Sequence, residues 1–451
     1  AVTVTDALGT TAGGTTVASG ATLELNGNIT VAENVTLNTG TLAGVSTPTL
    51  SGTLTLGAGT STVTVAASGD TLTLSGVLSG VGDLNKTGTG ALAIADTGLI
   101  YRLSGKTTVS GGTLSTTGDL VTMQTGQTLT IAGTMLSANG GVIDVDQAVV
   151  RVPFDGTNPI GTVVVSGTAP LVLLTTNTHT MATTTGSAMF DLAGNPANKT
   201  TESIDLGLVL GTVSRDLATD RPLRGSGTCP SCALQSTLLE ASGATISGEK
   251  LLKVDAALVE ATLPILKLLA ASTLTLNGDA ITLANLSKLV SGTGIASAML
   301  ALDASSMTIN VGALINATGG SFLSVLGDLV RLSNTSTLTL NDVTNGYVLR
   351  VSGGSVVDIA GALIDFTGTG NKVKAANTYN LINNPTETFV ELLGIRVHLT
   401  GGALSTQVEI LGTPLRGVGT NGVIENLVGG VFEGSLIELN GTASRVRIKG
   451  N

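Results

Sequence analysis

Short alternating runs of apolar and polar residues recur along almost the whole chain, and each run closes on Gly, Asn, Asp or Ser. Between residues 237 and 369 the runs are most regular, with units such as TLLEASG, LLKVDA, STLTLNGD and AITLAN that begin roughly every seven to nine residues. Alternation with a period of two predicts β-strands with one buried face, and the small polar residues predict turns between the strands. The fold class is therefore predicted to be all-β.

Three such units would make a turn of about 24 residues, close to one coil of a parallel β-helix. Longer echoes support stacked coils, because STLTLN at 272–277 returns at 336–341 and GDLVTM at 118–123 returns as GDLVRL at 327–332. Residues 250–271 are rich in Leu and Ala, but Pro264 would interrupt a helix there, and the strand phrasing continues through the segment. We predict a parallel β-helix, or β-solenoid, with irregular loop insertions.

Two stretches break the pattern and suggest how the chain is organised. Residues 151–236 contain several prolines and a polar run, and residues 371–388 carry Asn and Pro where a strand would be expected. We predict an N-terminal β-solenoid over residues 1–150, an irregular middle segment over 151–236, and a C-terminal β-solenoid over 237–451 with a loop insertion near 371–388.

Composition narrows the functional class. Aromatic residues make up 2% of the chain and charged residues 12%, so the core must consist of many layers of small aliphatic side chains. The net charge of −10 argues against nucleic acid or an anionic membrane as a partner. No run of about 18 apolar residues predicts a membrane-spanning helix. A start at Ala1 without a leader predicts a secreted protein, extracellular or at the cell surface, whose signal peptide has been removed.

Residues 78–117 carry a motif of ordered Gly, Leu, Lys and Thr positions. The segment resembles the autotransporter-associated β-strand repeat of bacterial surface proteins. The matching positions are Gly80, Gly82, Leu84, Lys86, Gly88, Gly90, Leu92, Tyr101, Gly105, Thr107, Val109, Gly112 and Leu114. The resemblance implies a right-handed parallel β-helix exported to a bacterial surface, and the rest of the chain is similar in style to filamentous-haemagglutinin-like adhesin passengers. Autotransporters end in an aromatic-rich barrel, whereas this chain ends RVRIKGN, so a cleaved passenger or a secreted building block is expected.

No constellation of residues predicts catalysis. His179 and His398 lie far apart in strand-like runs, and both are expected to point outward into solvent. Asp144 and Asp146 would share a face, with Arg151 five residues later, and could hold calcium or act on a uronate. Because acids are otherwise scattered about one per strand, solvated outer-face pairs are the preferred interpretation. We expect no catalytic residue, no metal site, no cofactor and no enzyme activity.

The two cysteines lie close together, as Cys229-Pro-Ser-Cys232. A redox motif would need a following helix, and a zinc site would need two further ligands nearby. Neither is evident, so we predict a local disulfide between Cys229 and Cys232 that pins a loop outside the cell.

Threonines recur as Thr-x-Thr pairs, for example Thr53/Thr55, Thr62/Thr64, Thr71/Thr73 and Thr273/Thr275. Stacked threonines can match an ice lattice, but Thr is also a common outward residue of strands. The irregular spacing between pairs along the chain argues against a flat lattice.

The two ends of the chain differ in charge. Residues 1–100 include Asp6 and Glu24 among six acids, against one Lys and no Arg, which gives a net charge of −5. The last predicted strand presents Arg445, Arg447 and Lys449. An acidic head that meets a basic tail favours head-to-tail contacts, which do not close and therefore grow a fibre.

The expected function is a structural subunit of a bacterial extracellular filament, sheath or surface fibre, with other copies of itself as the main partner. One alternative is an adhesin passenger that binds cell-surface glycans or neighbouring cells through its loops. A second alternative is a polysaccharide lyase or hydrolase on a β-helix scaffold.

Overall fold

The computed structural model covers all 451 residues. It describes residues 1–5, 7–9, 12–95, 102–103, 106–122, 128–153, 162–166, 169–194, 203–206, 215–216, 221–222, 237–261, 263–292 and 297–376, and the strands 388–390, 397–400, 406–410, 415–416, 422–426, 437–440 and 444–448. These residues contain strands and turns and no helix, so nothing among them could cross a membrane as a helix.

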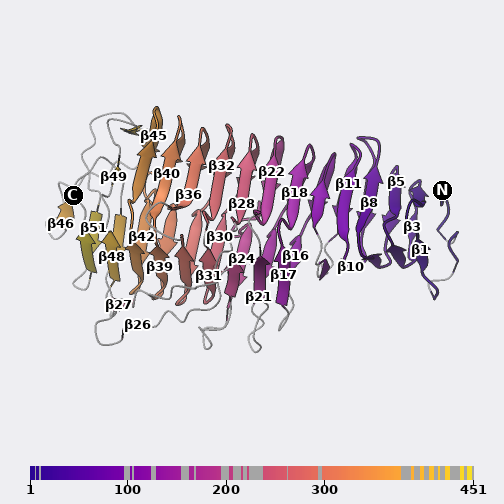
Figure 1. Ribbon diagram of the computed structural model, residues 1–451, viewed down its shortest axis with the longest axis horizontal. Coiled ribbons are helices and arrows are strands. Elements are labelled where there is room, and N and C mark those ends of the chain that lie inside the picture. Colours follow the sequence, from indigo (N-terminus) through magenta and orange to yellow (C-terminus); the bar gives the residue numbers. More distant parts are fainter. Residues whose placement is uncertain are drawn as a thin grey trace.

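The strands stack into a rod with the two ends of the chain at opposite ends (Figure 1). Two sheets run along most of the rod. Sheet A contains β2 (Thr22–Asn26), β5 (Thr41–Val45), β8 (Thr60–Val65), β11 (Asp83–Thr87), β14 (Thr107–Val109), β18 (Leu136–Asn139), β22 (Val172–Thr175), β28 (Leu239–Ser242), β32 (Leu266–Leu269), β36 (Ala298–Asp303), β40 (Asp328–Ser333), β44 (Ile364–Thr367) and β49 (Leu415–Arg416). Sheet C contains β3 (Thr30–Val31), β6 (Thr49–Leu50), β9 (Thr71–Leu74), β12 (Ala91–Ile94), β15 (Thr113–Thr116), β19 (Val142–Val145), β23 (Thr178–Met181), β29 (Thr245–Gly248), β33 (Thr273–Leu276), β37 (Ser306–Ile309), β41 (Thr337–Leu340), β45 (Asn371–Ala375) and β50 (Gly422–Asn426).

The remaining sheets each cover part of the rod. Sheet B closes the N-terminal coils with β1 (Thr15–Val17), β4 (Val35–Leu37), β7 (Leu54–Leu56), β10 (Leu78–Gly80) and β13 (Arg102–Leu103). Sheet D contains β16 (Val121–Thr122), β20 (Val150–Val152), β24 (Phe190–Ala193), β30 (Leu252–Asp255), β34 (Ile281–Ala284), β38 (Ile315–Ala317), β42 (Leu349–Ser352), β47 (Val397–Thr400), β51 (Ile437–Asn440) and β46 (Thr388–Val390). Sheet E contains β17 (Thr128–Ala132), β21 (Thr162–Ser166), β25 (Ser203–Leu206), β31 (Leu258–Ala261), β35 (Lys288–Ser291), β39 (Phe322–Val325), β43 (Val356–Ile359), β48 (Thr406–Ile410) and β52 (Ser444–Ile448).

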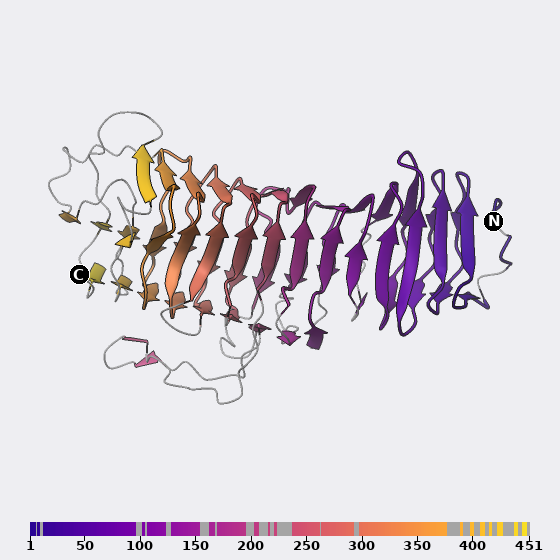
Figure 2. The same ribbon diagram turned by 45° about the horizontal axis from the view of Figure 1, so that its top comes forward.

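Neighbouring strands in these sheets run parallel, except β46, which is antiparallel to β51. Successive coils therefore pair side by side along the rod, as Figure 2 shows. This is the predicted all-β parallel solenoid. A separate antiparallel pair, β26 (Arg215–Asp216) and β27 (Arg221–Pro222), stands outside the stacked sheets.

The size of the coil changes along the rod. Coils up to β15 have three strands, from sheets B, A and C, so that β7 and β10 are consecutive strands of sheet B. From β16 onward each coil takes one strand from each of sheets A, C, D and E, so that β38 and β42 are consecutive strands of sheet D. The predicted coil of three units is therefore right for the N-terminal coils and wrong for the coils from which it was deduced. There, the same short units are grouped in fours.

The pairing of the strands shows whether the repeated sequences occupy equivalent positions in the coils. The two STLTLN copies lie in β33 and β41, two coils apart in sheet C, so this echo is a true structural repeat. The GDLV copies lie in sheets D and A, so they are not equivalent rungs.

The observed strand boundaries also show which of the predicted segments form strands. Residues 250–271 form β30, β31 and β32, as the strand phrasing predicts. Strands β21 to β25 lie in the segment predicted to be irregular and pair with the coils on either side. Asn371, predicted to open a loop, instead begins β45 and is fully buried.

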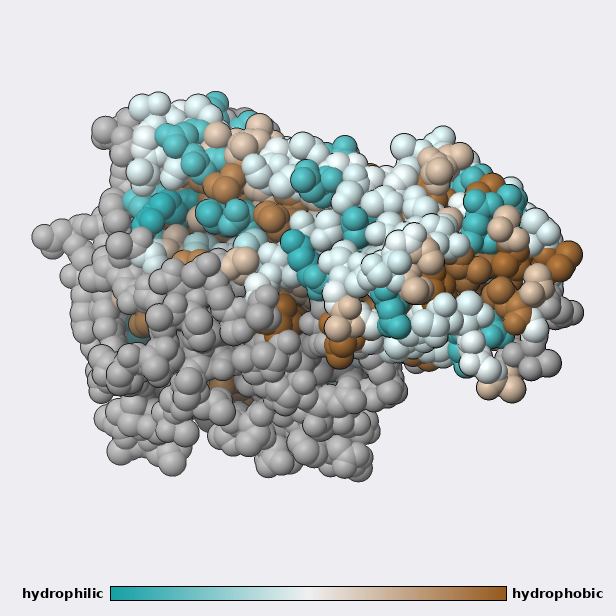
Figure 3. All heavy atoms as spheres, turned by 45° about the vertical axis from the view of Figure 1, so that its right-hand side comes forward, coloured by the Kyte–Doolittle hydropathy of each residue, from teal (hydrophilic) through white to brown (hydrophobic). Residues whose placement is uncertain are grey.

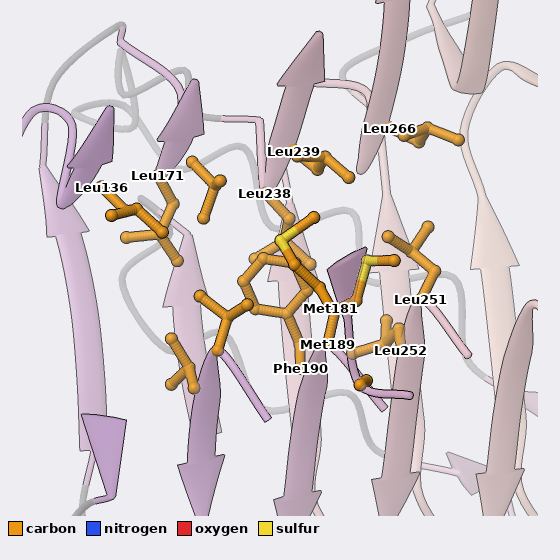
Figure 4. Close-up of a cluster of buried hydrophobic side chains, with 14 of the residues drawn as sticks. Leu136, Leu171, Met181, Met189, Phe190, Leu238, Leu239, Leu251, Leu252 and Leu266 are labelled. Atoms are coloured by element: carbon orange, nitrogen blue, oxygen red, sulfur yellow. The ribbon is translucent and has the colours of Figure 1, made fainter. Parts of the chain in front are cut away.

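The inward side chains form one hydrophobic cluster that runs from Val2 to Val373. Most of its members are Leu, Val and Ile, as the composition requires. Phe190 and Phe366 are the largest apolar side chains that are fully buried. Figure 4 shows Phe190 between Met181, Met189 and leucines from several coils, where the flexible methionines fill the space around the ring.

Candidate functional site

The N-terminal end of the rod exposes strand edges. β1 and β3 are the outermost strands of sheets B and C. Among the described residues, β2 is covered by a single bridge from Val2, whose N–H donates to the Glu24 carbonyl at 2.6 Å and whose carbonyl accepts from Asn26 at 2.8 Å. Unpaired parallel edges of this kind offer backbone donors and acceptors to another strand.

Apolar side chains gather at the same end. Val4 is 61% exposed, and Leu8, Leu23 and Ile29 are only partly buried against the core. Figure 3 shows the resulting hydrophobic surface at the N-terminal end of the rod. Open edges and apolar side chains therefore coincide on one face, which we call the head face: β1, β3, Val4, Leu8, Leu23 and Ile29.

The opposite end is organised differently. β46 turns back and pairs antiparallel with β51, so it covers the edge of sheet D. Among the described strands, β49, β50 and β52 are the last of sheets A, C and E. The last predicted strand does form, as β52 in sheet E, and β51 precedes it in sheet D.

The residues predicted to mark the two ends are only partly described. Glu24 lies in β2, half-buried, and its Oε1 accepts a hydrogen bond from Asn26 Nδ2 at 3.2 Å. Arg445 and Arg447 lie in β52, in register with Gln407 and Glu409 of β48. Asp6 and Lys449 lie outside the described residues.

His179 is not an outward side chain, and the prediction that it would be is wrong. It is fully buried in β23, in register with Ile246 of the next coil. Its Nδ1 accepts the N–H of Ile143 at 3.1 Å, while its Nε2 lies 2.9 Å from the Thr176 carbonyl. Such contacts fit the neutral tautomer with its proton on Nε2. Burial lowers the pKa of His179, against a smaller opposing effect of the Thr176 carbonyl, so the ring is a structural bridge between coils. His398 lies in β47, in register with Arg350.

Asp144 and Asp146 are not grouped with Arg151, as the alternative of a calcium or uronate site would require. Asp144 lies in β19 on sheet C, where it accepts a hydrogen bond from the Thr180 hydroxyl, and Asp146 accepts one from Thr183 at 3.2 Å. Arg151 lies in β20 on sheet D. There its Nε is 2.9 Å from Asp119 Oδ2. The geometry that a uronate or calcium site would need is therefore not assembled from these residues.

Lys86, from the repeat-like segment, is the largest fully buried side chain. It occupies an inward position of β11, in register with Val63 and Val109. Its ammonium donates to the carbonyls of Thr87, Gly88 and Gly111 at 2.9, 3.1 and 3.1 Å. Desolvation lowers its pKa to about 8. Because the side chain is sealed from solvent, we interpret Lys86 as a tie between turns of adjacent coils rather than as a reactive amine.

An ionic bridge on sheet A was not predicted. Arg331 Nη2 is 2.6 Å from Asp328 Oδ2, and its Nε is 3.0 Å from Asp365 Oδ2 in the next coil. Burial lowers the pKa of Arg331, but the hydrogen bonds and charges of both aspartates outweigh this and raise it above its ordinary value. Asp328, with no solvent-exposed surface, also accepts the N–H of Ala362 at 2.8 Å.

The repeated GDLV sequence was a signal for the Asp328 part of this bridge. Asp119 belongs to the other GDLV copy and likewise accepts a backbone N–H from the next coil, that of Ala148, at 2.9 Å. The GDLV echo therefore marks an Asp that joins consecutive coils, although the two copies lie in different sheets.

Neither metal-binding geometry nor similarity to known proteins assigns a further site. In the part of the chain that the structure describes, no three His, Cys, Asp or Glu side chains are grouped so that they could hold a metal ion. Cys229 and Cys232 lie outside that part, so their disulfide stays a prediction. No family model, curated protein or solved structure matches this chain.

Proposed function

We propose that this protein is a structural subunit of an extracellular bacterial fibre, in which copies stack head to tail. The observation that carries the proposal is the head face, where open strand edges and exposed apolar side chains coincide. A second copy that adds its last coil there would extend sheets A and C, which reach both ends of the rod, and bury Val4, Leu8 and Ile29. A contact of this kind repeats without closing and so produces a filament.

Two further features support a structural role as a rigid rod. The hydrophobic cluster is continuous from Val2 to Val373, so each coil is held by its neighbours over the whole of that length. The thirteen strands of sheet A span twelve inter-strand spacings, or about 58 Å at roughly 4.8 Å each. Buried polar groups such as His179 and Lys86 bridge adjacent coils, which suits a rigid shaft.

The charges at the two ends of the chain are consistent with head-to-tail stacking. Residues 1–100 carry a net charge of −5, and Arg447 lies in β52, the last described strand of sheet E. Opposite charges at the two ends would steer the head of one copy toward the tail of another and disfavour head-to-head contacts.

A backbone substitution tests the stacking directly. The N–H of Thr15 donates to Asn34 at 2.7 Å, and the carbonyl of Val17 accepts from Asn38 at 2.9 Å, both within the rod. Alternation along β1 then directs the N–H and carbonyl of Thr16 toward the open edge. Thr16→Pro removes that donor while leaving the internal bonds in place, and Thr16→Val keeps it.

Electron microscopy and light scattering of the purified chain provide the readout. We expect fibres from the native chain and from Thr16→Val, and single rods from Thr16→Pro. Native protein that remains as single rods at high concentration and moderate salt would refute head-to-tail assembly. Fibres of equal length from Thr16→Pro would show that the head face is not the contact.

A further inference from the structure

The outer face of sheet C carries a regular array of hydroxyl groups. In five consecutive strands, β23, β29, β33, β37 and β41, both outward positions are Thr or Ser. The parallel register aligns them in two columns. One column is Thr178, Thr245, Thr273, Ser306 and Thr337, and the other is Thr180, Ser247, Thr275, Thr308 and Thr339. We call these ten residues the hydroxyl array.

The array is regular in space although its members are unevenly spaced in sequence. Thr178 and Thr245 are more than twice as far apart along the chain as Ser306 and Thr337, yet both pairs are direct register partners. Extra residues between strands are accommodated outside sheet C and do not shift its register. The sequence-based objection to a flat lattice, uneven spacing, therefore does not apply to these five coils.

The hydroxyl groups are available to solvent rather than used by the fold. Thr180 bonds to Asp144, but none of Thr245, Thr275, Thr308 and Thr339 has a side-chain hydrogen bond to any described residue. By contrast, serines at the turns, such as Ser336, are buried and bonded within the fold. The array is thus a surface whose polar groups are left for water or a ligand.

The array is also free of charge and bounded by charge. Asp144 precedes it in the second column, and Lys372 and Lys374 follow it in β45. Beside it, Asn277, Asn310 and Asn341 form a third column, with amide-to-amide hydrogen bonds of 2.9 Å between successive coils. This column ties the strands of three coils together at that edge, which keeps the neighbouring hydroxyl columns in register.

From this geometry we propose that the hydroxyl array binds the surface of ice. Strands in a sheet repeat every 4.7–4.9 Å, and alternate residues of one strand lie roughly 6.6 Å apart, so the hydroxyl groups form a near-rectangular net. Such a net resembles the spacing of oxygen atoms on crystal faces of ice. Each Thr adds a methyl group beside its hydroxyl, and the combination orders water without the tightly oriented hydration shell of a charged group. The array extends over four inter-strand spacings, about 19 Å.

Ice is favoured over a crystalline polysaccharide by what the outward positions contain. Aromatic side chains provide large, flat apolar contact surfaces, and none of the ten array positions is aromatic, so the array has no surface on which a flat sugar ring could stack. Binding to cellulose or chitin is therefore an outcome of the test that would count against the proposal.

A single bulky substitution in the middle of the array tests it. Thr308→Tyr places a ring between Thr275 and Thr339 at an outward position that accepts aromatic residues. Thr62→Tyr is the matched control, because Thr62 is an outward residue of β8 on sheet A, flanked by Thr41 and Asn85. Circular dichroism and thermal unfolding establish that both variants fold.

Ice-affinity partitioning and thermal hysteresis give the readout for the native chain and both variants. We expect the native chain and Thr62→Tyr to enter a growing ice front and to depress its growth temperature, and Thr308→Tyr to lose both effects. Exclusion of the native chain from ice, equal activity in Thr308→Tyr, or equal loss in the control each overturns the proposal. Repeating the assay in Thr16→Pro separates ice binding from fibre formation, because that variant leaves sheet C unchanged.

Discussion

The three-sheet coils from β1 to β15 and the four-sheet coils from β16 to β45 both run through sheets A and C, but several of their corners are joined by different contacts. In the three-sheet region, glycine permits consecutive turns to lie almost in contact. A Cβ on Gly52 would lie 2.1 Å from the Glu33 carbonyl, and one on Gly76 would lie 2.1 Å from the Gly52 carbonyl. The glycines of this corner therefore stack directly on one another.

In the four-sheet region some glycines also lie against backbone, such as Gly327, where a Cβ would lie 2.0 Å from the Ser297 carbonyl. Other corners of this region are joined by buried serines. Ser336 donates to the Ser333 carbonyl at 2.6 Å and accepts the N–H of Ser305 in the preceding coil at 3.2 Å. Ser355 accepts the N–H of Ser321 in the same way at 3.0 Å, at the corner between sheets D and E. A side chain, rather than close backbone contact, joins the coils at these corners.

This difference indicates that corner residues, more than strand residues, determine the cross-section of the rod. Strands on both sides of the change alternate in the same manner and pair through the same sheets A and C. A wider coil has more corners and more backbone groups that leave the sheets, and these need partners. Buried Ser, Asn and His side chains provide such partners in the four-sheet region.

The largest effect is expected where backbone lies against backbone. Gly52→Ala should destabilise the three-sheet region by about 3 kcal/mol, because the Glu33 carbonyl cannot move without shifting its whole coil. Hydrogen exchange measured by mass spectrometry should show faster exchange in β4 and β7 and little change beyond β28, since coils couple mainly to their neighbours.

Gly69→Ala is the control for this substitution. Gly69 lies in an exposed turn of the same region, and a Cβ there meets nothing within 4 Å. Its exchange pattern should match that of the native chain. Equal effects of the two substitutions would mean that close approach between coils is not what the glycines provide.

A smaller effect is expected at a serine corner. Ser336→Ala removes the acceptor of the Ser305 N–H in a fully buried place, and an unsatisfied buried donor costs about 2 kcal/mol. Ser306→Ala removes a hydroxyl from the outer face and should change stability by less than about 0.5 kcal/mol. Urea unfolding of the two variants checks the ranking, and a loss for Ser306→Ala as large as that for Ser336→Ala would contradict it.

The strands of this fold follow from the sequence, whereas the coil does not. Period-two alternation identifies β30 to β32 despite their Leu- and Ala-rich composition, because burial on one face imposes that period. The number of strands per coil depends on turn angles, and those depend on which turn residues are buried. STLTLN shows the limit: its repeat was visible, but the role of its leading serine, Ser272 or Ser336, required the neighbouring coil.

The candidate surfaces were less predictable than the fold. Buried positions are predicted from the hydrophobicity of each residue, so a lone His or Lys in a strand is expected to face solvent. Lys86 and His179 break this expectation because each finds backbone partners at a corner. The Thr-x-Thr pairs of the hydroxyl array were visible in the sequence, but their alignment was not, since columns arise from register between distant strands and not from spacing along the chain.

Burial of Lys86, in the three-sheet region, should have a measurable effect on stability at high pH. The pKa of Lys86 is about 8 in the folded protein and 10.5 when unperturbed, so between these values the unfolded chain binds more protons. Stability therefore rises with pH across this window, by no more than about 1.4 kcal/mol per pH unit. Urea unfolding from pH 7.5 to 10.5 should show this rise in the native chain relative to Lys86→Met. A difference between the two that stays flat or falls would show that the ammonium is not desolvated.

The buried base of the four-sheet region should respond in acid instead, and this is the smallest effect expected. Burial holds the pKa of His179 below its ordinary value of 6.5, so below pH 6.5 the unfolded chain takes up a proton that the folded chain resists. The contribution of His179 is complete above pH 6.5 and is lost as pH falls toward the lowered pKa. His179→Gln retains an acceptor for Ile143 and a donor for Thr176 but cannot titrate, so it should lose less stability than the native chain between pH 7 and 5. Identical pH profiles would mean that the imidazole is already solvated, and the two regions would then no longer differ in how they shield a buried base.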